Sequence, residues 1–506
     1  MTSDPGLTPV QPAGPAPVPA SGSGHAVVLG AGVAGLLAAR VLTETFARVT
    51  VLDRDDLPGL HTDTAADPAA GGAGQFGDRR GVPQARHLHA LMDRGRQIVE
   101  ELHPGAVAEL IAAGAPTSEV LVGGRYYMHG QRLRPTSTGL VSVLASRPLL
   151  ERTLLRRTAA LPGVQVRPRT AVAGLVGSAA GGEGGEGGRV TGVRIRPGGD
   201  SGDAGPGAET VLPAELVVDA SGRNSRSLDW LAALGQQSPP ISRVTVDLGY
   251  ASRLYERRPE HLDGENSVIV ATAPGLIGAG VARTEDSRWI VTLAGLLGAH
   301  PPTDDAGFLA FARALPVPDV YDLVRAATPL TPPVPFRFRE SVRRRFEALR
   351  APLDGLVVLG DALCSFNPLY AQGMTVAAQQ ALVLRTALAA GLPGVPRRFY
   401  GAVAPVLDVA WDMATSADLR YPQVTGRRSP RGRVTGAYAA RAQRRAAHDP
   451  RVARTLMRVV NLVDPPTALL RPALAVRVLA PTPRAGRAAD RSPARAIADP
   501  AEAARP

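Results

Sequence analysis

The pattern of hydrophobic and polar positions predicts a βαβ unit near the N-terminus. The apolar run Ala26–Leu29 has the length of a buried strand, and a helical pattern follows it after a short glycine-rich stretch. A second apolar run, Val49–Leu52, ends at the acidic residue Asp53. Apolar strands that alternate with helical patterns are typical of an α/β fold with a parallel sheet.

A different pattern begins near Ile241, where apolar and polar residues alternate with period two. Such alternation predicts a mostly antiparallel sheet with one face packed and one face free to line a cavity. Two runs carry the apolar side chains that we expect on the cavity face. These candidate substrate-lining residues are Val246, Leu248, Tyr250, Trp289, Val291 and Leu293.

Strand and helix patterns return after residue 350. The run Leu356–Leu359 is strand-like and is followed by Gly360-Asp361-Ala362, and a helical pattern runs from Gly373 to about Ala390. The chain from there to about residue 481 is helical by pattern and rich in arginine. These segments predict a return to the first domain, followed by a helical C-terminal region.

The glycine-rich stretch after the first strand reads Gly30-Ala31-Gly32-Val33-Ala34-Gly35. Its G-x-G-x-x-G spacing, with an acid about twenty residues further on, indicates a dinucleotide-binding turn. Gly30 permits the turn, Gly32 lets the backbone approach a pyrophosphate, and Gly35 lets helix and strand pack closely. The carboxylate of Asp53 can accept hydrogen bonds from a ribose diol, so the unit predicts FAD or NAD rather than NADP. Arg54, the next residue, is a further candidate cofactor-binding residue.

FAD is the dinucleotide that explains the later segments as well. We expect the adenosine at Asp53, the pyrophosphate at Gly30–Gly35, the ribityl chain at Asp361 and the flavin ring at the helix that begins at Gly373. The positive end of a helix stabilises a nearby anion by roughly 0.5 to 2 kcal/mol. A reduced flavin develops such a negative charge.

Composition excludes several other chemistries. The net charge of +12 comes entirely from arginine, because the sequence contains no lysine, and this excludes Schiff-base catalysis. Aromatic residues make up only 4% of the chain, so base-stacking platforms for nucleic acid are scarce and we expect no nucleic-acid partner. The single cysteine, Cys364, excludes an internal disulfide and a cysteine-based metal cluster. We expect no metal site.

Four ordered motifs resemble one known family. The segments GAGVAGLLAA, SRPLLE, VVDASGRNSR and LGDALCSFNPLYAQGMTVAA together resemble the FAD-dependent monooxygenases of the p-hydroxybenzoate hydroxylase-like fold. The run RRGVPQARHLHALMDRG, with LGYASR and TLAG, is similar to the bacterial flavin epoxidases of polyether antibiotic pathways. The resemblance covers about residues 25–425.

This resemblance implies roles for individual residues. The glycines of the turn and Asp53 would hold the ADP half of FAD, and Arg79 and Arg147 match family arginines that contact its phosphate and ribityl groups. Asp361 matches the ribityl ligand. The segment beside the flavin ring contains Pro368, Gln372, Gly373 and Met374. His87 and His89 are explained best by loop hydrogen bonds, with a catalytic role as the alternative.

The sequence departs from the family pattern at two positions. Ala371 stands where the family more often has glycine, so we expect a small strain or a different position of the loop. The middle motif is Asp219-Ala220-Ser221-Gly222, whereas hydroxylases that take NADPH directly usually have Asp-Gly. Reducing equivalents from NAD(P)H are therefore expected directly or through a separate flavin reductase.

We expect a monooxygenase that inserts one oxygen atom from O2 through a flavin C4a-hydroperoxide. The favoured reaction is epoxidation of alkenes in a large apolar secondary metabolite such as a polyketide, because electrophilic attack on an alkene needs no protein base. The alternatives are an aromatic hydroxylase, which usually needs a polar relay at the substrate, and a geranylgeranyl reductase-like flavin reductase. Flavin halogenases use an essential lysine, which this chain lacks.

The predicted fold class is α/β, with a Rossmann-like FAD-binding domain, an inserted antiparallel substrate domain and C-terminal helices. The arginine-rich C-terminal helices could contact a membrane surface weakly. The N-terminus lacks a secretory signal, so we expect a cytoplasmic protein. The predicted segments are a disordered leader at 1–24, the FAD-binding domain at 25–240 and 351–400 with glycine-rich loops near 178–210, the substrate domain at 241–350, C-terminal helices at 401–481 and a disordered tail at 482–506.

Overall fold

The computed structural model describes residues 23–57, 60, 79, 81–178, 188–198, 209–426 and 430–481. The predicted tail and all of the predicted leader except residues 23 and 24 lie outside the described residues. Most of the two glycine-rich loops near 178–210 lies outside them as well. Within the described residues, no helix is long and apolar enough to cross a membrane.

The predicted βαβ unit forms the centre of a five-stranded parallel sheet. The apolar strands of the unit are buried because other secondary-structure elements cover both faces of the sheet. In order across the sheet, the strands are β17 (Leu356–Val358), β11 (Leu216–Asp219), β1 (His25–Leu29), β2 (Arg48–Leu52) and β7 (Val164–Arg167). The predicted parallel sheet and its return strand after residue 350 are confirmed.

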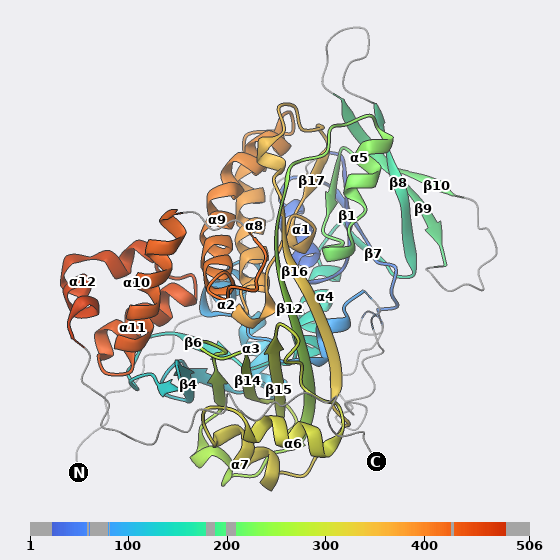
Figure 1. Ribbon diagram of the computed structural model, residues 1–506. Helices are drawn as coiled ribbons and strands as arrows, with labels where there is room; N and C mark the ends of the chain where they lie inside the picture. Colours follow the sequence, from blue (N-terminus) through green and yellow to red (C-terminus); the bar gives the residue numbers. More distant parts are fainter. Residues whose placement is uncertain are drawn as a thin grey trace, which may run out of the picture.

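Helices and a small sheet form the layers next to the parallel sheet (Figure 1). Helix α1 (Val33–Leu42) packs against α8 (Gly373–Leu388), and α8 packs against α2 (Asp93–Leu102) and α9 (Val395–Asp418). The small antiparallel sheet contacts β11 and β2. It contains β8 (Thr170–Ser178), β9 (Arg189–Pro197) and β10 (Thr210–Pro213). The remaining elements of this part are α3 (Ala106–Ala112), α4 (Arg147–Ala159), α5 (Ser227–Ala233), β3 (Thr117–Glu119) and β6 (Val141–Val143).

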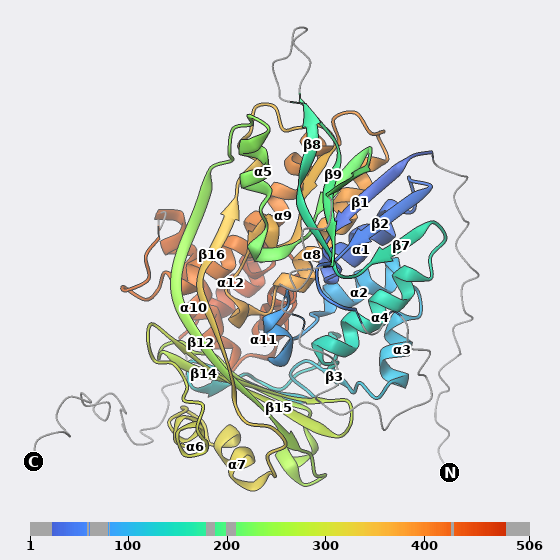
Figure 2. The same ribbon diagram turned by 90° about the vertical axis from the view of Figure 1, so that its right-hand side faces the viewer.

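The predicted antiparallel sheet is an eight-stranded, mostly antiparallel sheet. Its two long strands run from the end near α6 and α7 toward the parallel sheet (Figure 2). In order, its strands are β18 (Cys364–Ser365), β16 (Val334–Arg344), β12 (Ile241–Glu256), β15 (Arg288–Leu296), β14 (Ile277–Thr284), β13 (Ser267–Val270), β4 (Gly124–Met128) and β5 (Gln131–Arg132). Strands β4 and β5 belong to the segment assigned to the first domain, so the sheet extends beyond residues 241–350.

The two faces of this sheet have different neighbours, and this corrects part of the predicted substrate lining. Trp289, Val291 and Leu293 are fully buried in a core with the helices α6 (Asp305–Arg313) and α7 (Asp319–Ala326). The register pairs Leu293 with Ala251, which places Leu293 on the face opposite Tyr250. The three residues are therefore core residues and not lining residues. Val246 and Leu248 are also fully buried, in the core that includes the parallel sheet, and do not line the cavity described below. Of the six predicted lining residues, Tyr250 is the one that lines it.

The C-terminal helices are α10 (Pro430–Ala446), α11 (Pro450–Val460) and α12 (Pro472–Leu479). They form a separate group at the side of the molecule (Figure 1). The apolar face of α11, which includes Leu456 and Met457, is buried against Val120, Leu133 and Leu140 of the same chain. The arginine-rich helices predicted from the sequence are confirmed, and the main apolar face of α11 is covered internally.

Candidate functional site

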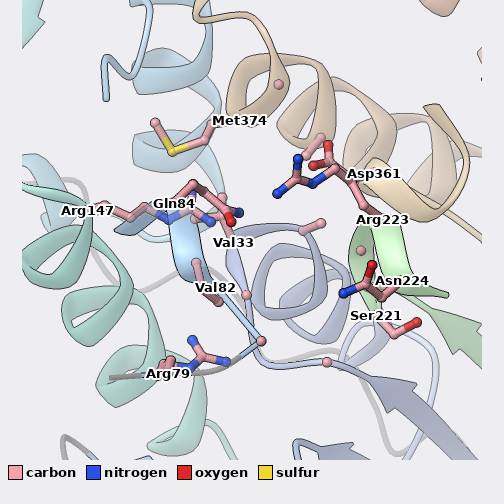
Figure 3. A pocket seen from close by; sticks show the side chains of 18 of the residues that line it. Val33, Arg79, Val82, Gln84, Arg147, Ser221, Arg223, Asn224, Asp361 and Met374 are labelled. Atoms are coloured by element: carbon pink, nitrogen blue, oxygen red, sulfur yellow. The ribbon is translucent and has the colours of Figure 1, made fainter. Parts of the chain in front are cut away.

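A cavity of about 410 Å³ lies between the carboxyl ends of the parallel strands and the large antiparallel sheet. Ligands of open α/β sheets bind at this edge, outside the carboxyl ends of the strands. In Figure 3, Arg147 and Gln84 lie on one side of the cavity, and Asp361 and Arg223 lie on the other. The predicted residues that line it are Gly30, Gly32, Val33, Ala34, Asp53, Arg54, Arg79, Arg147, Tyr250, Asp361, Pro368, Gly373 and Met374.

The glycine turn has the geometry expected of a phosphate cradle. Gly30 has a φ of +101°, and a Cβ there would lie 2.7 Å from the Ala220 carbonyl oxygen. A Cβ on Gly35 would lie 1.9 Å from the Gly30 carbonyl oxygen, so only glycine allows this close packing. At Gly32 a Cβ would have one neighbour within 4 Å, Glu151 Oε1 at 3.8 Å, and no side-chain hydrogen bond caps α1. The amides and positive end of α1 are therefore available to an anion.

Asp53 joins the turn to the second strand. Its Oδ2 accepts hydrogen bonds from the Ala31 backbone amide at 2.7 Å and from Arg79 Nη2 at 2.7 Å. Its Oδ1 accepts a hydrogen bond from the Asp55 backbone amide at 2.9 Å. Asp53 thus fixes the turn and orients Arg79 at the cavity, in addition to its predicted contact with a ribose.

Glu151 links the two predicted arginines, and sequence reasoning missed it. Its Oε2 lies 2.9 Å from Arg79 Nη1, and its Oε1 lies 2.7 Å from Arg147 Nη2. Burial would raise the pKa of the Glu151 carboxyl, but Arg147 and Arg79 outweigh burial and leave the pKa below its usual value. A sequence signal was present, because Glu151 follows Arg147 by four positions on a helix capped by Ser146.

Asp361 and Arg223 meet on the other side of the cavity. Asp361 belongs to the short helix η7 (Gly360–Ala362), and Arg223 to η4 (Gly222–Asn224). Burial raises the pKa of Asp361, while Arg223, Arg147 and Arg344 act to lower it. The Arg223 guanidinium also lies 5.2 Å from the centre of the Phe336 ring. Asp361 could be predicted from the sequence, but Arg223 was missed. Only the folded chain brings Arg223 to the same side of the cavity as Asp361.

The middle motif organises the loop that carries Arg223. Asp219 is fully buried at the end of β11. It accepts hydrogen bonds from the Ser221 hydroxyl at 2.5 Å, the Ser225 hydroxyl at 2.5 Å and the Ser227 hydroxyl. The Asp219 carboxylate therefore holds its own loop in place through these hydrogen bonds, which is a structural role.

The predicted flavin-ring segment forms the short helix η8 (Pro368–Tyr370) and the start of α8. Ala371 adopts the left-handed conformation, with φ 51°, which favours glycine. This is the small strain that the sequence predicted as one of two alternatives. Gln372 does not line the cavity; it is buried, with its Nε2 4.0 Å from Met413 Sδ. Asp418 anchors the segment, because its Oδ1 accepts hydrogen bonds from Asn367 Nδ2 and Tyr370 OH.

These residues fit FAD. An uncapped α1 and the absence of a side chain at Gly32 suit a pyrophosphate. An acid at the β17 end suits a polyol, and α8 also begins without a side-chain cap beside it. The cavity joins all three places in one volume.

Two family models match segments that contribute residues to the cavity. Residues 28–92 match the NAD(P)-binding Rossmann-like domain, and residues 334–392 match the squalene epoxidase family. Protein Rv3254 of Mycobacterium tuberculosis is 34% identical over 453 residues, which cover 87% of this chain and 90% of that protein.

Solved structures with low sequence identity share the fold. The flavin-dependent brominase Bmp2 is 14% identical with a TM-score of 0.58, over 86% of this chain and 93% of that chain. PqsL, a probable FAD-dependent monooxygenase from Pseudomonas aeruginosa, is 17% identical with a TM-score of 0.52, over 78% and 97%. The Diels-Alderase PyrE3 is 16% identical with a TM-score of 0.53, over 88% and 81%. Such different activities show that the fold does not fix the reaction. The chain belongs to the family of protein Rv3254, within the superfamily of FAD-dependent monooxygenases.

Proposed function

We propose that this protein is an FAD-dependent monooxygenase that epoxidises alkenes of a large apolar metabolite such as a polyketide. One observation carries the proposal: a single cavity runs from the dinucleotide turn at Gly30 to an aromatic wall that contains Tyr250 and Phe336. The polar end suits a cofactor, and the aromatic end suits an apolar substrate. The match of residues 334–392 to the squalene epoxidase family supports the epoxidase assignment.

Each part of the cavity has a role in this chemistry. When bound, FAD would supply two-electron reduction of O2, with one oxygen atom transferred to the substrate and the other released as water. The α1 amides and Gly32 would hold the pyrophosphate, and Asp361 the ribityl hydroxyls. The N-terminus of α8 would stabilise the negative charge that develops on the reduced flavin. Tyr250 and Phe336 exclude water and position the substrate.

An aromatic hydroxylase is the second candidate function. Tyr250 and Phe336 are stacked, with ring centres 6.0 Å apart and planes at 30°, which would also suit a flat aromatic substrate. A phenol needs deprotonation for attack, whereas an alkene does not. The two candidates therefore differ in the product rather than in the cofactor site.

An isotope experiment separates these functions. The FAD-loaded protein is reduced chemically without oxygen, mixed with squalene or 2-naphthol, and exposed to ¹⁸O₂. A labelled epoxide of squalene supports the proposal, and a labelled hydroxylated naphthol supports the hydroxylase instead. A saturated, unlabelled product supports a reductase. If flavin is retained and neither probe yields a labelled product, the monooxygenase proposal fails for both substrate classes.

A further inference from the structure

His87 has a ring nitrogen that the proposed chemistry has not used. The residue follows the short helix η3 (Pro83–Arg86), lines the cavity and is only 3% exposed. Its Nδ1 lies 2.7 Å from the Ser252 hydroxyl. Its Nε2 is buried and has no hydrogen-bond partner among the described residues. Buried polar atoms normally have partners, and because His87 also lines the cavity, a ligand in the cavity could be the partner of this nitrogen.

The direction of the adjacent hydrogen bonds assigns the proton on His87. The Leu88 backbone amide can only donate, and it donates to Thr292 Oγ1 at 3.0 Å. The Thr292 hydroxyl lies 2.6 Å from Ser252 Oγ and has no other acceptor among the described residues, so its proton points to Ser252. The Ser252 hydroxyl then donates to His87 Nδ1. The remaining proton of a neutral ring is therefore on Nε2.

The surroundings of His87 keep its ring neutral and place two aromatic rings close to it. Burial, with a smaller contribution from Arg86, lowers the pKa of His87 to about 4. The ring centre lies 5.2 Å from that of Phe336 and 6.0 Å from that of Tyr250. His87 therefore carries one N–H donor on a ring that packs beside Tyr250 and Phe336 at the wall of the cavity.

We propose that the His87 Nε2–H group donates a hydrogen bond to a carbonyl oxygen of the substrate, and that the substrate is an apolar ketone with a flat, unsaturated hydrocarbon part. This inference rests on the proposed function and narrows its substrate class. The aromatic wall would contact the flat apolar part of the substrate, and His87 would fix its position through the oxygen. A site that donates a hydrogen bond to an oxygen binds an analogue without that oxygen more weakly, because the donor is then left unpaired.

A matched pair of probes tests the assignment without turnover. 2-Acetylnaphthalene and 2-isopropenylnaphthalene have similar shapes, but a CH₂ group replaces the carbonyl oxygen in the second. Each is titrated into the oxidised, FAD-loaded protein, and calorimetry gives its Kd. We expect the ketone to bind about tenfold more tightly, which corresponds to about 1.4 kcal/mol.

Three variants locate the source of this preference. His87→Phe keeps a ring but removes the donor, so the ketone preference should disappear. His87→Gln can place an amide N–H near the position of Nε2 and should retain part of it. His103→Phe is the matched control, because His103 also has a buried, unpartnered Nε2 but does not line the cavity. It should keep the full preference.

Several results would overturn the inference. These are equal binding of both probes by the unchanged protein, no binding of either probe, or a ketone preference that survives in His87→Phe. Loss of FAD from folded His87→Phe and His87→Gln would instead assign His87 to the cofactor site. If the isotope experiment yields labelled product while the ketone preference is absent, the proposed function stands and the role of His87 is refuted.

Discussion

Gly32 and Gly35 provide the sharpest test of the dinucleotide turn, because the same substitution should act differently at the two positions. A Cβ on Gly35 would lie 1.9 Å from the Gly30 carbonyl oxygen, which is a backbone atom. A Cβ on Gly32 would meet only Glu151 Oε1, at 3.8 Å. The Gly32 backbone is extended, with φ −82° and ψ 178°, and any residue can adopt this conformation.

These contacts set the expected magnitudes. Overpacking a core typically costs about 1 to 3 kcal/mol, and a backbone obstacle cannot rotate away. We therefore expect Gly35→Ala to lower the free energy of unfolding by about 3 kcal/mol. Gly32→Ala should change it by less than about 1 kcal/mol, the usual range for a helix N-cap. The added methyl group would hold a pyrophosphate away from the backbone and weaken FAD binding at least tenfold, or about 1.4 kcal/mol.

Urea denaturation of the cofactor-free variants gives the stabilities, and FAD titration followed by flavin fluorescence gives the affinities. Gly401→Ala is the control, because a Cβ on this helical residue of α9 meets nothing within 4 Å. It should bind FAD normally. If folded Gly32→Ala binds FAD as tightly as the unchanged protein, the assignment of the pyrophosphate to this turn is refuted. If Gly35→Ala is as stable as the unchanged protein, the packing argument is refuted.

Further predictions concern the charges around the cavity. Glu151→Gln should lower the free energy of unfolding of the cofactor-free protein by about 3 kcal/mol, because Arg79 and Arg147 lose a largely buried anion. Added FAD should restore part of the lost melting temperature, and no recovery would contradict a contact between these arginines and the FAD phosphates. Burial raises the pKa of Asp418 to about 6, so the folded state holds this proton more tightly than the unfolded state. The stability that Asp418 contributes should therefore fall by about 2 kcal/mol between pH 4 and 7 relative to Asp418→Asn in urea denaturation, and a constant difference would show that the carboxyl does not titrate there. Because the middle motif reads Asp219-Ala220-Ser221-Gly222 in place of Asp-Gly, NADH or NADPH alone should bleach the bound flavin slowly in a stopped-flow experiment, and an added flavin reductase should accelerate the bleaching. Fast direct bleaching would refute a separate electron donor.

The sequence by itself determined the parts of the site that depend on short segments. Gly30, Gly35 and Asp53 lie within one βαβ unit, so local spacing was sufficient to predict the turn and its chemistry. Asp361 and Gly373 could be predicted because each follows or begins a recognisable element. At Ala371 the sequence left open a small strain or a different position of the loop, and the structure shows the left-handed conformation, at φ 51°.

Only the tertiary structure decided which distant residues face the cavity. Period-two alternation predicts that a strand has two faces, but the pairing register decides which face of one strand continues on the next. For this reason Tyr250 lines the cavity, whereas Leu293 is buried on the opposite face. The tautomer of His87 depends on hydroxyl groups of Ser252 and Thr292, which folding brings to it from other strands. Hydrogen bonds and ion pairs act over a few ångströms in space, and distance along the chain does not encode them.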